Sequence, residues 1–324
     1  MTISAISRTF AAPGPGRGLF YLVAVFLLCP WFAGGSRAES GAGGVAVFVS
    51  QDIRPYLEAA QGISAVLAEN AAAQVELFSL DKITGKSRDL LRQRLDQENP
   101  ALSIAIGPEA VRLVGETVAA RGAPWLYGMT LNPVEVWPGA AVACGIPLDI
   151  PPARQLEMIS LGLPGVRQLG LLYDPLFNSA FFEAAAAAAD LLDLTIVPLA
   201  VSSKKEIPGI LKRHFDGLDA LWLIPDRTVI SESIVHYIIK EALFSDIPVI
   251  GYNRFFYESG AALSFVFDYG DLGRQAGRMA LAVLAGRPCE KESPVFRVWR
   301  NPRVINKLGI GLPQRAVPLI EDGP

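Results

Sequence analysis

The sequence predicts an α/β protein with two lobes, each built on a parallel sheet covered by helices. Short apolar runs rich in β-branched residues alternate with amphipathic, helix-length segments along most of the chain. Apolar strands that alternate with helices are typical of parallel sheets buried on both faces. A proline-containing connection at 145–149 divides this alternation into two series. Each series is long enough to form a lobe of ordinary size.

The first series contains the opening strands and helices. Val45–Val49 is a β-branched and aromatic run, and the segment 55–70 that follows carries apolar residues at helical spacing. The same alternation recurs further along the chain. Strands are expected at 74–78, 102–106 and 124–127, and helices at 85–97 and 108–121.

The second series opens with a helix at 152–161 and continues with the same alternation. Its strands are expected at 168–173, 195–199, 220–224 and 248–251, and its further helices at 180–192, 205–215 and 232–244. After Gly260 the pattern predicts a strand at 262–267, a helix at 272–284 and a strand at 295–299.

The N-terminus has the pattern of a secretory signal peptide. Arg8 and Arg17 precede an apolar run at 19–32, and Ser36-Arg37-Ala38 places small residues at the two positions that a signal peptidase reads. We expect cleavage after Ala38, which leaves a mature periplasmic protein of 286 residues that does not span the membrane. A retained anchor is the alternative, but a span needs about 20 apolar residues and Pro30 interrupts the end of this run.

Charge and motifs exclude several functional classes. Loss of residues 1–38 removes three arginines and no acid, so the formal net charge changes from −3 to −6. An acidic chain without a cluster of Lys and Arg argues against a nucleic-acid partner. The sequence contains no Gly-x-Ser-x-Gly, His-Glu-x-x-His or phosphate-binding loop in a suitable context, and His214 and His236 fall on predicted helices. We therefore expect no enzyme, catalytic residue, cofactor or metal site, and a monomeric protein.

Three cysteines occur in the chain. Cys29 lies in the predicted signal peptide, and its lipidation is not expected because Leu27-Leu28 stand where small residues would be required. Cys144 and Cys289 are too few for a zinc site or a disulfide scaffold. Composition favours two separate, partly buried thiols. A single disulfide, which an oxidising compartment permits, is the alternative.

Polar residues follow the predicted strands of the first series. Ser50 and Gln51 follow the first strand, Gly107-Pro108 follows the third and opens a helix, and Thr130 follows the fourth. Ligands of open α/β sheets bind at the carboxyl ends of the strands. A helix start also offers backbone N–H groups to a carboxylate. Pro108 lacks an N–H group and Glu109 adds negative charge, which weakens anion capture by this helix.

Further polar residues follow two strands of the second series. Asp226 and Arg227 come after the strand at 220–224, and Asn253 and Tyr257 come after the strand at 248–251. Asp226 either contacts a ligand or caps the next turn beside Thr228. Arg227 either binds an acidic ligand group or lies at the mouth of the site. Aromatic side chains near Tyr257 suit an apolar ligand body.

A resemblance to a known family rests on two segments. Residues 173–179 read Tyr-Asp-Pro-Leu-Phe-Asn-Ser. Residues 219–278 contain two strands that end in polar loops, followed by a segment with which the chain would return to the first lobe. With these motifs the sequence resembles ABC transporter substrate-binding proteins related to the tryptophan- and tyrosine-binding lipoproteins, which have a type I periplasmic-binding fold. The resemblance extends from Val45 to Ile310.

The resemblance implies two Rossmann-like lobes joined by a three-segment hinge. Lobe one would comprise 44–147 plus 262–288, lobe two 148–261 plus 289–315, and residues 316–324 would form a tail. Cys144 and Cys289 would then both lie beside crossover segments, which makes a hinge disulfide a hypothesis.

The resemblance also implies roles for individual residues. Asn178 and Ser179 would lie over the ligand together with Tyr173, although Ser179 could instead cap the following helix. Asp226 would receive a ligand ammonium group. This sequence has Gly107-Pro108 where the family has Gly-Thr, and Arg227 where relatives have a small or polar residue. The full set of predicted ligand-binding residues is Ser50, Gln51, Gly107, Pro108, Thr130, Tyr173, Asn178, Ser179, Asp226, Arg227, Asn253 and Tyr257.

The implied function is capture of a small ligand between two lobes and its delivery to an ABC permease and ATPase complex. The expected ligand is an amino acid or a related amine-bearing solute, with aromatic solutes included. A periplasmic ligand sensor that docks on a membrane receptor is the alternative, and a hydrolase is less favoured. The same fold serves both transport and sensing, so fold does not separate them.

Overall fold

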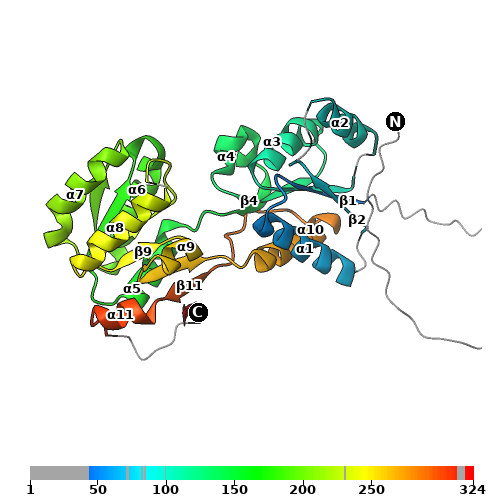
Figure 1. The fold of residues 1–324 in the computed structure, drawn as a ribbon. Coiled ribbons are helices and arrows are strands. Elements are labelled where there is room, and N and C mark those ends of the chain that lie inside the picture. Colours follow the sequence, from blue (N-terminus) through cyan, green and yellow to red (C-terminus); the bar gives the residue numbers. More distant parts are fainter. Residues whose placement is uncertain are drawn as a thin grey trace, which may run out of the picture. The chain divides into compact units, whose positions relative to one another are not determined.

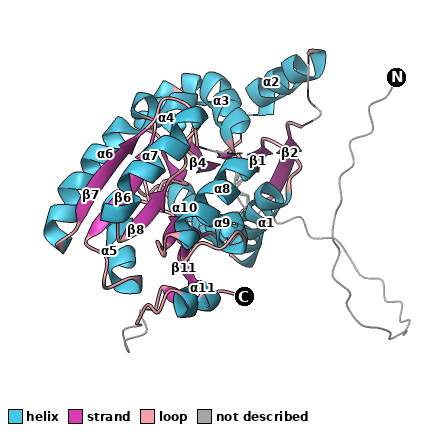
Figure 2. Cartoon of the chain, turned by 60° about the vertical axis from the view of Figure 1, so that its left-hand side comes forward, coloured by secondary structure: helices cyan, strands magenta, loops and turns pink. Residues whose placement is uncertain are grey.

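The computed structural model describes residues 44–70, 73–81, 83, 85–98, 100–229, 231–311 and 318–324 (Figure 1). The predicted signal peptide, its cleavage site after Ala38 and Cys29 lie outside the described residues. The described part contains two sheets flanked by helices (Figure 2), which confirms the expected two-lobed α/β class. Within these residues no helix combines the length and the apolar character needed to cross a bilayer.

The first sheet is parallel, with strand order β2-β1-β3-β4-β5. Its strands are β1 (Val45–Val49), β2 (Val75–Ser79), β3 (Leu102–Ile106), β4 (Trp125–Thr130) and β5 (Cys144–Pro147). The helices between these strands are α1 (Arg54–Glu69), α2 (Lys86–Glu98), α3 (Pro108–Thr117) and α4 (Pro133–Val136).

The second sheet has the order β12-β11-β10-β9-β8-β6-β7 and is parallel except where β10 meets β11. Its strands are β6 (Gln168–Tyr173), β7 (Thr195–Ala200), β8 (Ala220–Leu223), β9 (Val249–Gly251), β10 (Leu263–Val266), β11 (Arg297–Arg300) and β12 (Ile320–Asp322). The helices of this half of the chain are α5 (Pro152–Gly162), α6 (Pro175–Ala189), α7 (Ile207–His214), α8 (Glu232–Phe244), α9 (Arg254–Glu258), α10 (Tyr269–Leu284) and α11 (Pro302–Lys307).

Both faces of the first sheet are buried, which explains the continuous apolar character of β1. Val45, Val47 and Val49 pack in one core with residues of α1 and α10. The alternate residues Ala46 and Phe48 pack in a second core with residues of α2 and α3. Because successive side chains of a strand point to opposite faces, a strand covered on both sides must be apolar at every position.

One strand differs from its expected position. The run 262–267, expected in lobe one, forms β10 of the second sheet, where Leu263 pairs with Ile250 of β9. Phe265 is fully buried in the core of that sheet. Helix α10, which follows, packs instead against α1 and the first sheet. The expectation was wrong for this strand because an apolar run predicts a strand without showing which sheet it joins.

The C-terminal segment differs from an expected tail. Ile320–Asp322 forms β12, which pairs in parallel with β11. An ion pair of 2.6 Å joins Arg300 of β11 to Asp322 of β12. The short length of β12 and its charged residues leave little periodicity in the sequence from which a strand could be predicted.

Three segments connect the two sheets. The chain passes from β5 to α5 through 148–151, from β10 to α10 through Phe267-Asp268, and from α10 to β11 through 285–296. Buried Gln275 of α10 holds the third of these segments. Its Nε2 donates to the carbonyl oxygen of Ser293 at 2.9 Å, and its Oε1 accepts from the N–H of Val295 at 3.0 Å.

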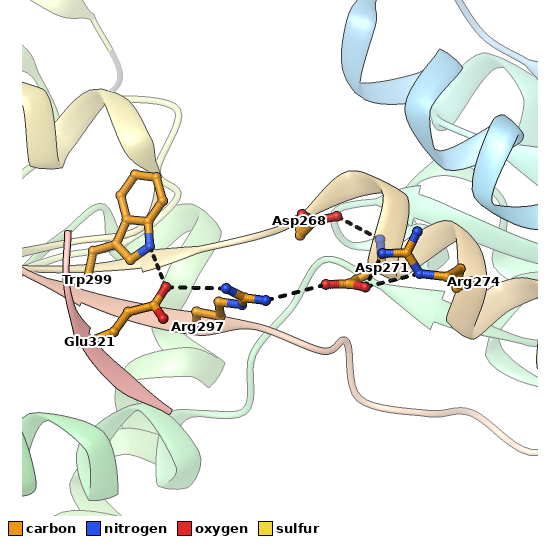
Figure 3. A network of polar contacts seen from close by, with 6 residues as sticks. All are labelled: Asp268, Asp271, Arg274, Arg297, Trp299 and Glu321. Carbon is orange, nitrogen blue, oxygen red and sulfur yellow. Dashed lines mark hydrogen bonds and ion pairs between the residues drawn. The ribbon is translucent and has the colours of Figure 1, made fainter. Parts of the chain in front are cut away.

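A polar network lies where the second and third segments leave the second sheet (Figure 3). Arg297 of β11 is 3.4 Å from Glu321 of β12 and 3.9 Å from Asp271 in the first turn of α10. Asp268 caps α10 by accepting the N–H of Asp271 at 2.8 Å. The network therefore connects the helix that packs on the first sheet with two strands of the second.

Cys144 and Cys289 form a disulfide, with Cα atoms 5.5 Å apart. The expectation of two separate thiols, which composition favoured, was therefore wrong, and the hypothesis of a disulfide is confirmed. The bond joins the start of β5 to the segment that follows α10, and the N–H of Glu292 donates to the carbonyl oxygen of Gly145 at 3.1 Å beside it. The third connection is thus tied to β5 of the first sheet.

Helices α1 and α10 approach so closely that glycine is required at their contact. A Cβ atom on Gly273 would lie 2.1 Å from the carbonyl oxygen of Ala59, and one on Gly62 would lie 2.4 Å from that of Gly270. We expect Gly273→Ala to lower the free energy of unfolding by about 1–3 kcal/mol, because backbone atoms must move apart. Urea unfolding measures the change.

Gly209→Ala is the matched control for this prediction. Gly209 lies in α7, and its added Cβ would meet only the flexible end of Arg213 at 3.4 Å. Alanine is the better helix former, so this variant is expected to be unchanged or more stable by up to about 1 kcal/mol. Equal stability of the two variants would contradict the proposed close contact of α1 and α10.

Candidate functional site

Ser50 and Gly107 meet at the carboxyl edge of the first sheet. The hydroxyl oxygen of Ser50, which is buried, accepts the N–H of Ala110 in the first turn of α3 at 3.0 Å. Gly107 has a φ angle of 88°, and a Cβ atom there would lie 2.7 Å from Ser50 Oγ. Ser50 therefore caps α3, and only glycine allows the two residues to approach this closely.

The start of α3 is poorly suited to binding an anion. Pro108 supplies no N–H group, the N–H of Ala110 is already bonded to Ser50, and Glu109 lies in the first turn. A helix N-terminus usually attracts a carboxylate. Here this attraction is weakened both by the lack of free N–H groups and by the negative charge of Glu109.

Thr130 and Gln51 differ in exposure. Thr130 is buried at the end of β4, and its hydroxyl donates to the carbonyl oxygen of Gly128 at 3.2 Å. Gln51 is exposed. Beyond β4, Asp149 Oδ2 accepts the N–H of Asn132 at 3.1 Å. Burial raises the pKa of Asp149. The hydrogen bond from Asn132 lowers this pKa by a smaller amount, and the negative charge of Glu135 raises it slightly further.

Asp226 is the centre of a hydrogen-bond network at the carboxyl edge of the second sheet. Its side chain is only 1% exposed. Oδ1 accepts the N–H groups of Thr228 and Val229 at 2.8 and 3.1 Å. Oδ2 accepts the N–H of Asp174 at 2.8 Å and Nδ2 of Asn178 at 2.7 Å. Asp226 therefore caps the turn beside Thr228, which was one of its two expected roles. Its contact with a ligand ammonium group stays a prediction.

The same network shapes the start of α6. Asp174 caps this helix by accepting the N–H of Leu176 at 2.9 Å, and it also accepts the Thr228 hydroxyl at 2.6 Å. Asn178 has non-helical angles (φ −128°, ψ 19°) and thereby reaches Asp226. Helix α6 accordingly begins at Pro175, five residues before the expected start at 180.

Ser179 does not cap the start of α6, so the capping role that was one of its two expected roles is wrong. It lies inside α6, where its hydroxyl donates to the carbonyl oxygen of Pro175.

Two tyrosines lie at strand ends of the second sheet. Tyr173, at the end of β6, is buried and stacks on Phe182 with ring centroids 5.0 Å apart. Burial raises the pKa of Tyr252, the residue after β9, to about 12, and the Asp226 carboxylate adds to this shift.

Arg227 is the exposed neighbour of buried Asp226. Its side chain is 69% exposed, and its Nη2 lies 3.0 Å from Oε2 of Glu135 in α4. The guanidinium carbon lies 5.2 Å from the centre of the Phe177 ring. Sequence reasoning missed Glu135 and Phe177. The position of Phe177 next to Asn178 was an available signal, whereas nothing local pointed to Glu135.

Asn253 and Tyr257 have partners of their own. Asn253 caps α9 by accepting the N–H of Phe256 at 3.3 Å. Tyr257 is buried, its hydroxyl donates to the carbonyl oxygen of Pro324 at 3.0 Å, and its ring packs edge-on against Trp299. Tyr257 thus contacts the C-terminal end of the chain, whereas Asn178, Asp226 and Arg227 lie together.

Metal chemistry receives no support from the described residues. Among them, no group of three or more His, Cys, Asp or Glu side chains is arranged to hold a metal ion. The four donors to Asp226 are N–H groups, which occupy the carboxylate without a cation.

The two sheets and their three connections define a two-lobed α/β class of protein. The family model of ABC transporter substrate-binding proteins matches residues 44–315, and the chain belongs to this family. Membership implies a small-molecule ligand and an ABC transporter as partner. A search of curated protein sequences finds no significant match.

Several solved structures share the fold. A ligand-free, open substrate-binding protein with adhesive properties from Clostridium difficile is 16% identical, with a TM-score of 0.72, and covers 87% of this chain and 100% of its own. A domain from Streptococcus pneumoniae in complex with L-Trp is 22% identical, with a TM-score of 0.54 and coverages of 83% and 96%. A glucose-galactose binding protein from Geobacillus stearothermophilus is 14% identical, with a TM-score of 0.51 and coverages of 80% and 97%. These similarities confirm the type I periplasmic-binding fold; the family and these structures are of binding proteins rather than enzymes.

Proposed function

We propose that this protein is exported, binds a small organic solute between its two lobes and delivers it to an ABC permease and ATPase complex. The observation that carries the proposal is the match of the substrate-binding family over 44–315. Two sheets, the first parallel and the second parallel except between β10 and β11, are connected by three chain segments, which agrees with it. Hinged closure of two lobes around a solute is a known motion of this architecture.

The solute is proposed to be an amino acid or a related amine-bearing compound, with aromatic compounds included. The structure from Streptococcus pneumoniae with L-Trp supports an aromatic amino acid as the first candidate. The strand-end residues predicted above are the proposed binding surface. Exposed Gln51 and Arg227 would contact the solute, whereas buried Ser50, Thr130 and Asp226 would hold the walls in place.

A thermal-shift screen of the mature protein against amino acids, amines, organic acids and sugars tests the function. At a concentration 100-fold above Kd, a ligand is expected to stabilise the folded protein by about 2.7 kcal/mol. The protein should be purified from the periplasm, where its N-terminal sequence is expected to start at Glu39. Turnover of a compound without stabilisation by any solute would contradict a binding function.

A further inference from the structure

Arg227 is held in an exposed position by its buried neighbour. Asp226 binds the N–H groups of Thr228 and Val229, which fixes the turn immediately after Arg227. Arg227 itself follows β8 at the carboxyl edge of the second sheet and is 69% exposed. The backbone at this position is therefore ordered while the guanidinium group faces solvent.

The ring of Phe177 covers one face of this guanidinium group. The guanidinium carbon lies 5.2 Å from the ring centre, within the range of a cation–π contact. Phe177 is brought there by the break in α6, because Asn178 leaves helical geometry to bind Asp226. Stacking on an aromatic ring leaves the N–H groups at the edge of a guanidinium free to bind an anion.

A carboxylate already lies at that edge in this structure. Glu135 Oε2 is 3.0 Å from Arg227 Nη2, and the Glu135 side chain is 50% exposed. Ion pairs between exposed side chains contribute little to stability. An incoming carboxylate can therefore replace Glu135 at small cost, especially one that also brings apolar contacts.

Exposed apolar side chains occur close in sequence to Glu135 and to Asn178, the residue that binds Asp226. Leu131 and Val134, before Glu135 in the chain, are 42% and 46% exposed, and Leu176 and Phe177 are 80% and 40% exposed at the start of α6. Among the described residues most apolar side chains of this size are buried, so these four offer surface to an apolar group. The neighbouring residue Asp226 is acidic and already binds four N–H groups, so Arg227 is the group of this turn that can bind an anion.

We propose that Arg227 and Phe177 form the carboxylate-binding part of the ligand site, and that Glu135 occupies the position of the ligand carboxylate in this structure. The ligand is thus an organic carboxylate with an aromatic or aliphatic body. This inference rests on the proposed solute-binding function and adds the chemical group that the site selects. Both an amino acid and a simple carboxylic acid satisfy it, whereas a simple amine does not.

Three probes with the same aromatic body separate these cases: L-phenylalanine, 3-phenylpropionate and 2-phenylethylamine. Isothermal titration calorimetry of the mature protein is expected to detect both carboxylates and not the amine. Binding of L-phenylalanine alone would show that an ammonium group is also required, and would still support the carboxylate site. Tighter binding of the amine than of either carboxylate would overturn the proposal.

Two variants of opposite expected effect test the residues. Arg227→Gln is expected to weaken carboxylate binding about 10–100-fold, because a charge-assisted hydrogen bond is lost. Glu135→Gln removes the competing carboxylate and is expected to tighten binding up to about 5-fold. A structural role alone would not change affinity in opposite directions. Arg213→Gln, at an exposed position of α7, is the control and should bind as the unaltered protein does.

The outcome also separates this inference from the proposed function. If a neutral sugar or an amine from the thermal-shift screen binds, and Arg227→Gln does not change its affinity, the carboxylate site is wrong and the solute-binding function stands. If no compound of the screen binds, the solute-binding function fails and the inference fails with it.

Discussion

Replacement of Asp226 by alanine is expected to lower the free energy of unfolding by about 3–5 kcal/mol. The variant leaves four N–H donors of the second lobe without their acceptor, namely those of Asp174, Asn178, Thr228 and Val229. Buried polar groups without a partner pay their full desolvation cost. Urea unfolding measures the loss, and buried Trp222 of β8 provides a fluorescence signal from the same sheet.

Asp226→Asn is expected to have an intermediate effect. One amide oxygen can still accept two of the donors, while the amide NH₂ faces the other two. Asp216→Ala, at an exposed position of the same lobe, is the control and should change stability by no more than about 0.5 kcal/mol. Equal stability of Asp226→Ala and Asp216→Ala would contradict the central role of Asp226 in this network.

Reduction of the disulfide between Cys144 and Cys289 is expected to lower the free energy of unfolding by about 2–5 kcal/mol. The bond spans a sequence separation of 145 residues, and closing so long a loop removes much conformational entropy from the unfolded chain. Unfolding in the presence and absence of reductant, followed by the fluorescence of Trp125 and Trp137 in the first lobe, gives the difference.

The double variant Cys144→Ser/Cys289→Ser is the control for reduction. It should have the stability of the reduced protein and should not respond to reductant. We expect the double variant to fold, because hydrogen bonds of 2.9–3.1 Å from Gln275 and Gly145 also hold the segment 285–296. Alkylation of two thiols in native protein without reductant would show that the bond is absent.

The positions of the site residues could be predicted in part from the sequence. Polar residues that follow buried strands made Asp226, Arg227 and Ser50 candidates, since ligand-facing loops lie at the carboxyl ends of parallel strands. The structure places all three after the strands that were expected to precede them. Their partners could not be predicted. Glu135 lies 92 residues before Arg227, and no local pattern connects the two.

Local sequence by itself determined most of the strands and the longer helices, because a residue's exposure repeats with the period of its own element. It thereby determined the α/β class and the division into two series. The short elements β12 and α11 carry too few residues for such a period. Only the tertiary structure decided that β10 joins the second sheet, that Cys144 meets Cys289, and that Asp226 binds four N–H groups of its own lobe. Each of these depends on long-range packing, in which one apolar run or one carboxylate has many possible partners, and the partner is chosen by the whole folded chain.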